Sequence, residues 1–172
     1  MIESVIFRNA MEDDVKYIIS LAYDQMNTYL EKSYNGAFNW EKWETELREV
    51  IYDQNHGNTL QNSSKVNRFT KAMIIEISEN QIGFIWFSYY SPDIIWVDSI
   101  ILNPEYQGKG YGTQIFIHLF GLFKADFQYL DLGVQEHNNG AIEFYKKLGF
   151  YQIDDIAMGY YLTNRMRKNL ND

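Results

Sequence analysis

The segment from Asn103 to Thr113 holds three glycines within five residues, at Gly108, Gly110 and Gly112. Because glycine has no Cβ, the backbone at these positions can come close to a ligand. The segment joins a predicted strand to a predicted helix, and the first turn of a helix presents unpaired N–H groups and the positive end of the helix dipole. These groups suit an anion, and the pattern predicts phosphate.

Spacing separates this segment from three other motifs that bind phosphate or nucleic acid. A dinucleotide-binding Rossmann fingerprint needs a third glycine where Thr113 stands, and a Walker A loop needs Ser or Thr where Gly110 follows Lys109. Lys109 to Gly112 with Phe116 partly copies an aromatic RNA-binding signature, but Thr113 interrupts it. A tight turn that starts a helix and binds nothing is the simplest alternative.

Two blocks of the sequence resemble the GNAT superfamily of acyl-CoA-dependent N-acyltransferases. The first, Gln107-x-x-Gly110-x-Gly112, is similar to that superfamily's [Gln/Arg]-x-x-Gly-x-[Gly/Ala] loop. The second block is Leu130-Asp131-Leu132-Gly133-Val134 followed by Asn138-x-x-Ala141-Ile142-x-Phe144-Tyr145-x-Lys147-Leu148-Gly149-Phe150. The resemblance implies an α/β (α+β) fold in one domain over residues 1–172, with a mixed, mainly antiparallel central sheet flanked by helices on both faces.

The resemblance further implies that acetyl-CoA is the co-substrate and that no metal is required. Backbone amides near residues 107–113 would bind the pyrophosphate, and the pantetheine arm would pair like an added strand beside Ile100 and Leu102. Lys109 either meets a phosphate or stays solvated, and Asn138 either caps its helix or binds the pantetheine. The expected cofactor-binding residues are Ile100, Leu102, Gln107, Gly108, Lys109, Gly110, Tyr111, Gly112, Thr113, Asn138 and Tyr145.

Two side chains are candidates for the proton transfers of acyl transfer from a thioester to an amine. The amine must be neutral to attack, so a base or a water chain has to take its proton. Asp98 is the expected base, four residues before Leu102 and on the same strand face unless a bulge intervenes. Tyr145 is the expected acid for the leaving thiolate. The structural alternatives are an acid paired with a neighbouring cation and a core tyrosine.

The function predicted from these residues is N-acetylation of a primary amine on a small molecule, by direct attack in a ternary complex. The acidic chain favours a polycationic or aminoglycoside-like acceptor. A peptide N-terminus or lysine is the alternative acceptor. An acyl-CoA-binding module without catalysis is the alternative of a different class.

Composition excludes several other classes of protein. The 172 residues include 15 Lys and Arg against 23 Asp and Glu, for a net charge of -8, which repels a nucleic-acid backbone. With no cysteine, disulfides, thiolate metal sites and cysteine nucleophiles are absent, and the three histidines lack metal-ligand spacing. We expect no nucleic acid, membrane or metal partner and a cytoplasmic location, because no secretory signal or long apolar span is visible. The sequence is compatible with a homodimer.

Hydrophobic periodicity predicts the elements that must position these residues. A helix begins near Met11, Asn39 caps another, and Gly149 ends the last in a left-handed conformation. The segment 53–68 reads as a long loop. Predicted strands cover 3–8, 69–78, 81–90, 94–102, 129–134 and the chain from 150 onward, and further helices cover 39–52, 113–127 and 139–148.

Overall fold

A seven-stranded sheet in the order β1-β2-β3-β4-β5-β7-β6 forms the centre of the molecule. The computed structural model describes residues 4–33, 38–57, 69–158 and 161–172. The strands are β1 (Ile6–Asn9), β2 (Phe69–Ile77), β3 (Asn80–Ser91), β4 (Ile94–Leu102), β5 (Tyr129–Gln135), β6 (Tyr151–Met158) and β7 (Tyr161–Asn169). Only β4 and β5 pair in parallel, and the other neighbours are antiparallel. The predicted mixed, mainly antiparallel sheet is confirmed.

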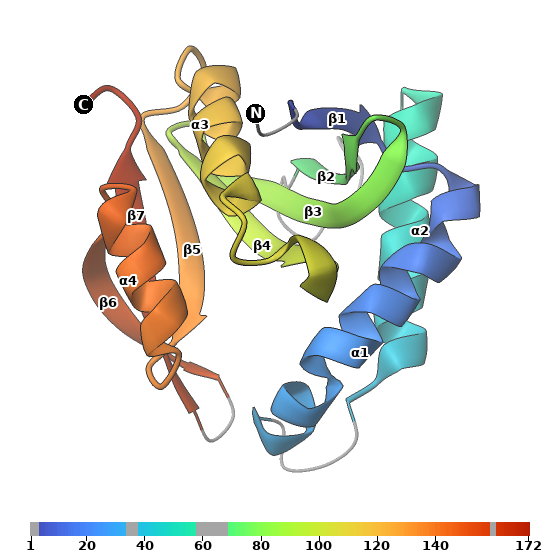
Figure 1. Cartoon of the computed structure of the whole chain (residues 1–172), viewed down its shortest axis with the longest axis horizontal. Coiled ribbons are helices and arrows are strands. Elements are labelled where there is room, and N and C mark those ends of the chain that lie inside the picture. The colour runs from blue at the N-terminus through green and yellow to red at the C-terminus, as the bar shows by residue number, and fades with distance from the viewer. Residues whose placement is uncertain (1–3, 34–37, 58–68, 159–160) are drawn as a thin grey trace.

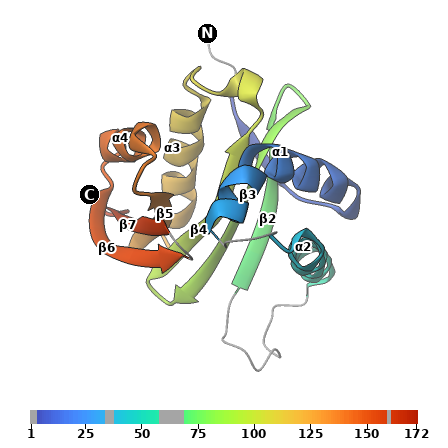
Figure 2. The same ribbon diagram turned by 90° about the horizontal axis from the view of Figure 1, so that it is seen from below.

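Helices cover both faces of this sheet, as predicted (Figures 1 and 2). They are α1 (Val15–Ser33), α2 (Trp40–His56), α3 (Tyr111–Phe123) and α4 (Asn139–Lys147), with short 3-10 turns η1 (Glu12–Asp14) and η2 (Pro104–Tyr106). Helices α3 and α4 lie on one face, and α1 and α2 lie on the other. The sheet therefore has two separate apolar cores.

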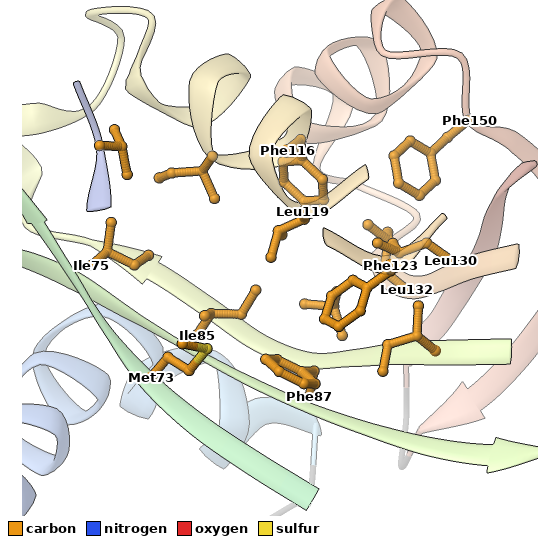
Figure 3. Close-up of a cluster of buried hydrophobic side chains, with 14 of the residues drawn as sticks. Met73, Ile75, Ile85, Phe87, Phe116, Leu119, Phe123, Leu130, Leu132 and Phe150 are labelled. Atoms are coloured by element: carbon orange, nitrogen blue, oxygen red, sulfur yellow. The ribbon is translucent and has the colours of Figure 1, made fainter. Parts of the chain in front are cut away.

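The core beneath α3 follows from the apolar arc of that helix. Phe116, Leu119 and Phe123 are buried and face strand residues such as Phe87 and Leu130 (Figure 3). The core on the other face joins α1 and α2 to strands β2, β3 and β4, through the buried residues Ile18, Leu47, Ile51, Ile74, Phe84, Trp86 and Ile101. Both pairs of helices are anchored by apolar side chains at helical spacing.

Element boundaries differ from the predictions at turns that glycine controls. Asn39 caps α2 by accepting a 2.9 Å hydrogen bond from the Lys42 amide, and Gly149 adopts φ 87°, both as predicted. Helix α2 runs on to His56 and ends at Gly57, so the predicted loop begins later than residue 53. The rest of that loop, residues 58–68, lies outside the described ranges. Helix α3 starts two residues early, and the chain after residue 150 forms two strands.

Candidate active site

A gap between β4 and β5 opens the middle of the sheet. The two strands pair only from Ile94 to Val97, opposite Tyr129 to Leu132, and then separate. Beyond that point β4 keeps β3 as its neighbour and β5 keeps β7. The gap forms a cleft of about 680 Å³, and Ile100 and Leu102 lie on its wall. The separation of the two strands leaves one side of β4 without a partner strand.

The turn from β4 into α3 brings backbone N–H groups to one end of this cleft. Gly108 and Gly110 have φ of 70° and 88°, a left-handed conformation that favours glycine, and α3 begins at the next residue. Within the described chain, no acceptor pairs with the backbone N–H groups of residues 108–113. These groups and the helix dipole give this end of the cleft a positive potential without any cationic side chain.

The side chains of this turn divide into two groups. Gln107, Gly108 and Gly112 line the cleft. Lys109 is exposed outside it, and the Tyr111 ring packs on the Tyr106 ring at 5.8 Å and against the core beneath α3. Gly110 and Thr113 do not line the cleft either. Cofactor binding by Lys109, Gly110, Tyr111 and Thr113 stays a prediction. It would use the backbone N–H groups of these residues or the ammonium group of Lys109.

Gln107 makes a contact that the sequence did not indicate. Its side-chain amide donates a 2.8 Å hydrogen bond to the carbonyl oxygen of Leu102, which joins the turn to the end of β4. Helix α1 holds the same turn from the other side, because the Tyr17 hydroxyl donates a 3.0 Å hydrogen bond to Oδ1 of Asn103. Burial raises the pKa of Tyr17 to about 12, so this hydroxyl stays protonated at neutral pH. These two bonds hold the part of the turn that follows β4.

Asp98 lies at a β-bulge on the cleft wall. Trp86 pairs with Ser99 and Phe87 pairs with Val97, so Asp98 is the extra residue on β4. Because of this bulge, simple alternation fails between Asp98 and Leu102. Leu102 packs against the core beneath α3, whereas Asp98 turns to the face of α1 and accepts a 2.6 Å hydrogen bond from the hydroxyl of buried Ser88. The sequence predicts a shared strand face for Asp98 and Leu102 unless a bulge intervenes. The bulge is present, and the two side chains lie on opposite faces.

Tyr145 lies across the gap from β4, on α4, with its side chain lining the cleft. Its ring packs edge-on against Phe116 at 5.5 Å and Phe150 at 5.5 Å. Burial raises the pKa of Tyr145 to about 12. The ring is fixed by core packing, and the hydroxyl stays protonated at neutral pH. Both sequence-based interpretations of this tyrosine, as core residue and as donor, fit its position.

Asn138 begins α4 at the edge of the cleft. Its side-chain oxygen accepts a 3.1 Å hydrogen bond from the Ala141 amide, which confirms the capping interpretation. The residue also lines the cleft, so a contact with the pantetheine stays a prediction. Capping directs the first turn of α4, and with it Ala141 and Tyr145, toward the gap.

Helix α1 supplies a wall of the cleft that sequence reasoning missed. Gln25, Met26 and Tyr29 line it opposite the ends of α3 and α4. The helical period places these residues on one side of α1, but nothing in the sequence says that this side faces the gap in the sheet. Such a contact depends on how α1 crosses β4, which is set by the packing of the whole molecule.

A second arrangement that the sequence did not indicate is the anchoring of β5 to β7. The Asp131 carboxylate is fully buried and accepts hydrogen bonds of 2.7 to 3.1 Å from Arg165 and Arg167. The two guanidinium groups also lie over the rings of Trp96 and Tyr129. This pairing joins the strands on the β5 side of the gap and leaves exposed Gly133 on the cleft wall.

Two absences hold for the described residues. No group of three or more His, Asp or Glu side chains is arranged to hold a metal ion there. In the same residues, no helix has the length and apolar character that a membrane span needs.

Comparisons with known proteins agree with this geometry. A family model described as the acetyltransferase (GNAT) family matches residues 24–150. The chain is 24% identical over 157 residues to an uncharacterised N-acetyltransferase of Methanocaldococcus jannaschii, which covers 87% of this chain and 62% of that protein. It is 47% identical over 62 residues to the probable N-acetyltransferase san of Drosophila melanogaster, covering 35% and 33%. The chain thus spans less than two thirds of the length of either relative.

Solved structures share the fold. The spermidine N-acetyltransferase of Vibrio cholerae, crystallised with CoA and spermine, matches with a TM-score of 0.70 at 20% sequence identity. The match covers 98% of this chain and 96% of that one.

Proposed function

The chain belongs to the acetyltransferase (GNAT) family, and on this premise we propose that it transfers an acetyl group from acetyl-CoA to the primary amine of a small molecule. The observation that carries the proposal is the gap between β4 and β5, which runs from unpaired amides at the start of α3 to Asp98 and Tyr145. An anionic, extended cofactor needs both a phosphate site and a strand edge, and the gap offers both.

The cofactor half of the cleft lies along α3 and α4. The backbone N–H groups of residues 108–113 would bind the pyrophosphate. The side of β4 at Ile100 and Leu102 that has no partner strand would pair with the amide groups of the pantetheine arm, at peptide groups other than the Leu102 carbonyl that Gln107 already contacts. Gln107 and Asn138 offer side-chain amides at the two ends of this path. No metal is needed, because the N–H groups and the helix dipole supply the positive potential.

Asp98 and Tyr145 divide the proton transfers between them. Asp98, directly or through one water, takes a proton from the acceptor ammonium, and the neutral nitrogen attacks the thioester carbon. A C–N bond forms and the C–S bond breaks. Tyr145 donates its hydroxyl proton to the departing thiolate, and its pKa of about 12 keeps that proton in place at neutral pH. The attacking nitrogen loses its second proton as the intermediate collapses, and that proton, passed through water, restores the Tyr145 hydroxyl, while Asp98 releases its proton to solvent. Attack is direct, since the chain has no cysteine to form an acyl-enzyme.

The experiment that tests the proposal measures free thiol release from acetyl-CoA against a panel of amines. We expect Asp98→Asn and Tyr145→Phe each to lower kcat by roughly 100-fold, while calorimetry gives the wild-type affinity for CoA. The matched controls are Asp155→Asn and Tyr151→Phe on β6, where both side chains are exposed and outside the cleft.

The controls should keep wild-type turnover. Binding of CoA without thiol release for any amine would favour a binding module and reject the enzyme. Full turnover by both cleft variants would reject the assigned roles and leave the activity standing.

A further inference from the structure

The cleft carries very little charge. Among the described residues that line it, Asp98 is the one carboxylate, and none is Lys or Arg. The other polar side chains are uncharged: the amides of Gln25, Gln107, Gln135 and Asn138, and the hydroxyls of Ser99, Tyr29 and Tyr145. If Asp98 serves the reacting amine, no second carboxylate on these walls remains for another ammonium group.

The wall that faces the acceptor is uncharged as well. The ends of α3 and α4 border the half of the cleft that would hold the cofactor. The acceptor amine would therefore enter the other half, which α1 borders. There Gln25, Met26 and Tyr29 of α1 line the cleft together with Ile101 of β4, and none of these side chains carries a charge. Met26 and Ile101 belong to the same apolar core, which means that this wall continues the interior of the molecule.

The acidic residues of α1 point elsewhere. Asp24 lies in a separate groove between α1 and α2, together with Glu44 and Arg48. Glu31 is exposed and does not line the cleft. The three internal segments outside the described ranges, 34–37, 58–68 and 159–160, contain no Asp or Glu, and 58–68 contains two basic residues. The N-terminal segment 1–3, which also lies outside those ranges, contains Glu3.

The net charge of -8 does not change this balance at the site. Charges on the surface raise the local concentration of cations and speed encounter, but salt screens them beyond about 8 Å at physiological ionic strength. An ammonium group inside the cleft interacts with the groups that touch it. A second ammonium group placed against Met26 and Tyr29 would lose its hydration. No carboxylate there would offset the free-energy cost of that loss.

We infer that the acceptor is a monoamine with an apolar body, and that polyamines are poor acceptors. This inference rests on the proposed function and narrows it. It departs from the polycationic acceptor that the acidic sequence favours, because the charge of the whole chain and the charge of the cleft differ.

The test compares two acceptors that differ by one charge. Hexylamine and 1,6-diaminohexane have the same carbon chain, and 2-phenylethylamine and spermidine extend the comparison. We expect kcat/KM per amino group to be at least tenfold higher for hexylamine than for the diamine, and likewise for 2-phenylethylamine over spermidine. All four are measured with saturating acetyl-CoA at one pH and one ionic strength.

A variant pair checks the cause. Met26→Glu places a second carboxylate on the α1 wall, and Met26→Gln has nearly the same shape without the charge. We expect Met26→Glu to raise the ratio of diamine to monoamine kcat/KM about tenfold, whereas Met26→Gln leaves that ratio at the wild-type value.

The outcomes separate the inference from the proposed function. Turnover of the diamine or spermidine at equal or higher efficiency than the monoamines would overturn the inference and support the acetyltransferase. An unchanged ratio in Met26→Glu would also count against the inference. Turnover of none of the four, together with failure of the wider amine panel, would overturn the proposed function itself.

Discussion

Ser88 lies in the middle of β3 with 2% of its surface exposed, and its hydroxyl donates a 2.6 Å hydrogen bond to Oδ2 of Asp98. Asp98 sits in a bulge, where the strand ladder does not fix its direction. The hydroxyl below it therefore sets where the carboxylate points. We regard Ser88 as a positioning residue that acts through Asp98.

A double-mutant cycle measures this role. Ser88→Ala should lower kcat/KM about tenfold, because one hydrogen bond to a charged group contributes about 1.5 to 3 kcal/mol. In an Asp98→Asn background the same change should have little further effect, since the two residues act as one unit. CoA affinity and thermal stability serve as controls. Additive losses in the double variant would show that Ser88 supports the fold and not the carboxylate.

At this scale the sequence predicted some functional residues and not others. Asp98 and Tyr145 became candidates because they lie in or beside the sequence blocks that resemble the family, and both line the cleft. The bond from Ser88 and the bond from Gln107 to Leu102 depend on which residues face each other across strands and turns. Register is a tertiary property, and one inserted residue reverses every later side chain on the strand.

Among the elements, β5 depends on one buried ionic group. Asp131 has no exposed surface and is held by Arg165 and Arg167 of β7. Replacing it with Asn would leave two partly buried guanidinium groups without their counter-charge. We expect Asp131→Asn to lower the free energy of unfolding by about 3–5 kcal/mol, measured by urea denaturation.

The matched control is Asp154→Asn on β6. Its carboxylate is 3.7 Å from the same Arg165, but 64% of its side chain is exposed. The loss there should stay below about 1 kcal/mol. Equal losses of unfolding free energy at the two positions would show that burial does not cause the large effect of Asp131→Asn.

Most elements were predictable from periodicity, and their connections were less so. The antiparallel strands β2 to β4 follow from short turns, and the order of the helices follows from apolar arcs. Two features escaped prediction: the return of β7 between β5 and β6, and the extension of α2 to His56. The position of β7 depends on pairing between strands far apart in the sequence. The longer α2 was missed because residues 53–56 contain no apolar side chain that would indicate a helix.

At the scale of the whole molecule, a polar junction joins the N-terminal segment to the sheet. Asp14 is 5% exposed and accepts hydrogen bonds from Arg8, from the Met11 amide and from Gln81. Burial opposes its ionisation, but the bonds from Arg8, Met11 and Gln81 outweigh burial and lower the pKa of Asp14 below its ordinary value. The junction holds β1, η1 and β3 together.

The sign of this pKa shift predicts the response to acid. A lowered pKa means that the stabilisation is present above about pH 4 and is lost as pH falls further. Asp14→Asn should cost about 1.5–3 kcal/mol of unfolding free energy at pH 7 and reduce the loss of stability as pH falls below about 4. Urea denaturation at several pH values measures both. Exposed Asp13→Asn is the control, and a parallel acid profile in Asp14→Asn would contradict the assignment.

The parting of β4 from β5 gives this sheet an inner edge in addition to its two outer ones. Alternate peptide groups of residues 98–102 point away from β3, and their hydrogens are open to exchange with solvent. Any ligand that completes the edge would slow deuterium uptake there. Occupancy can therefore be followed by mass spectrometry even in a variant that has lost all turnover.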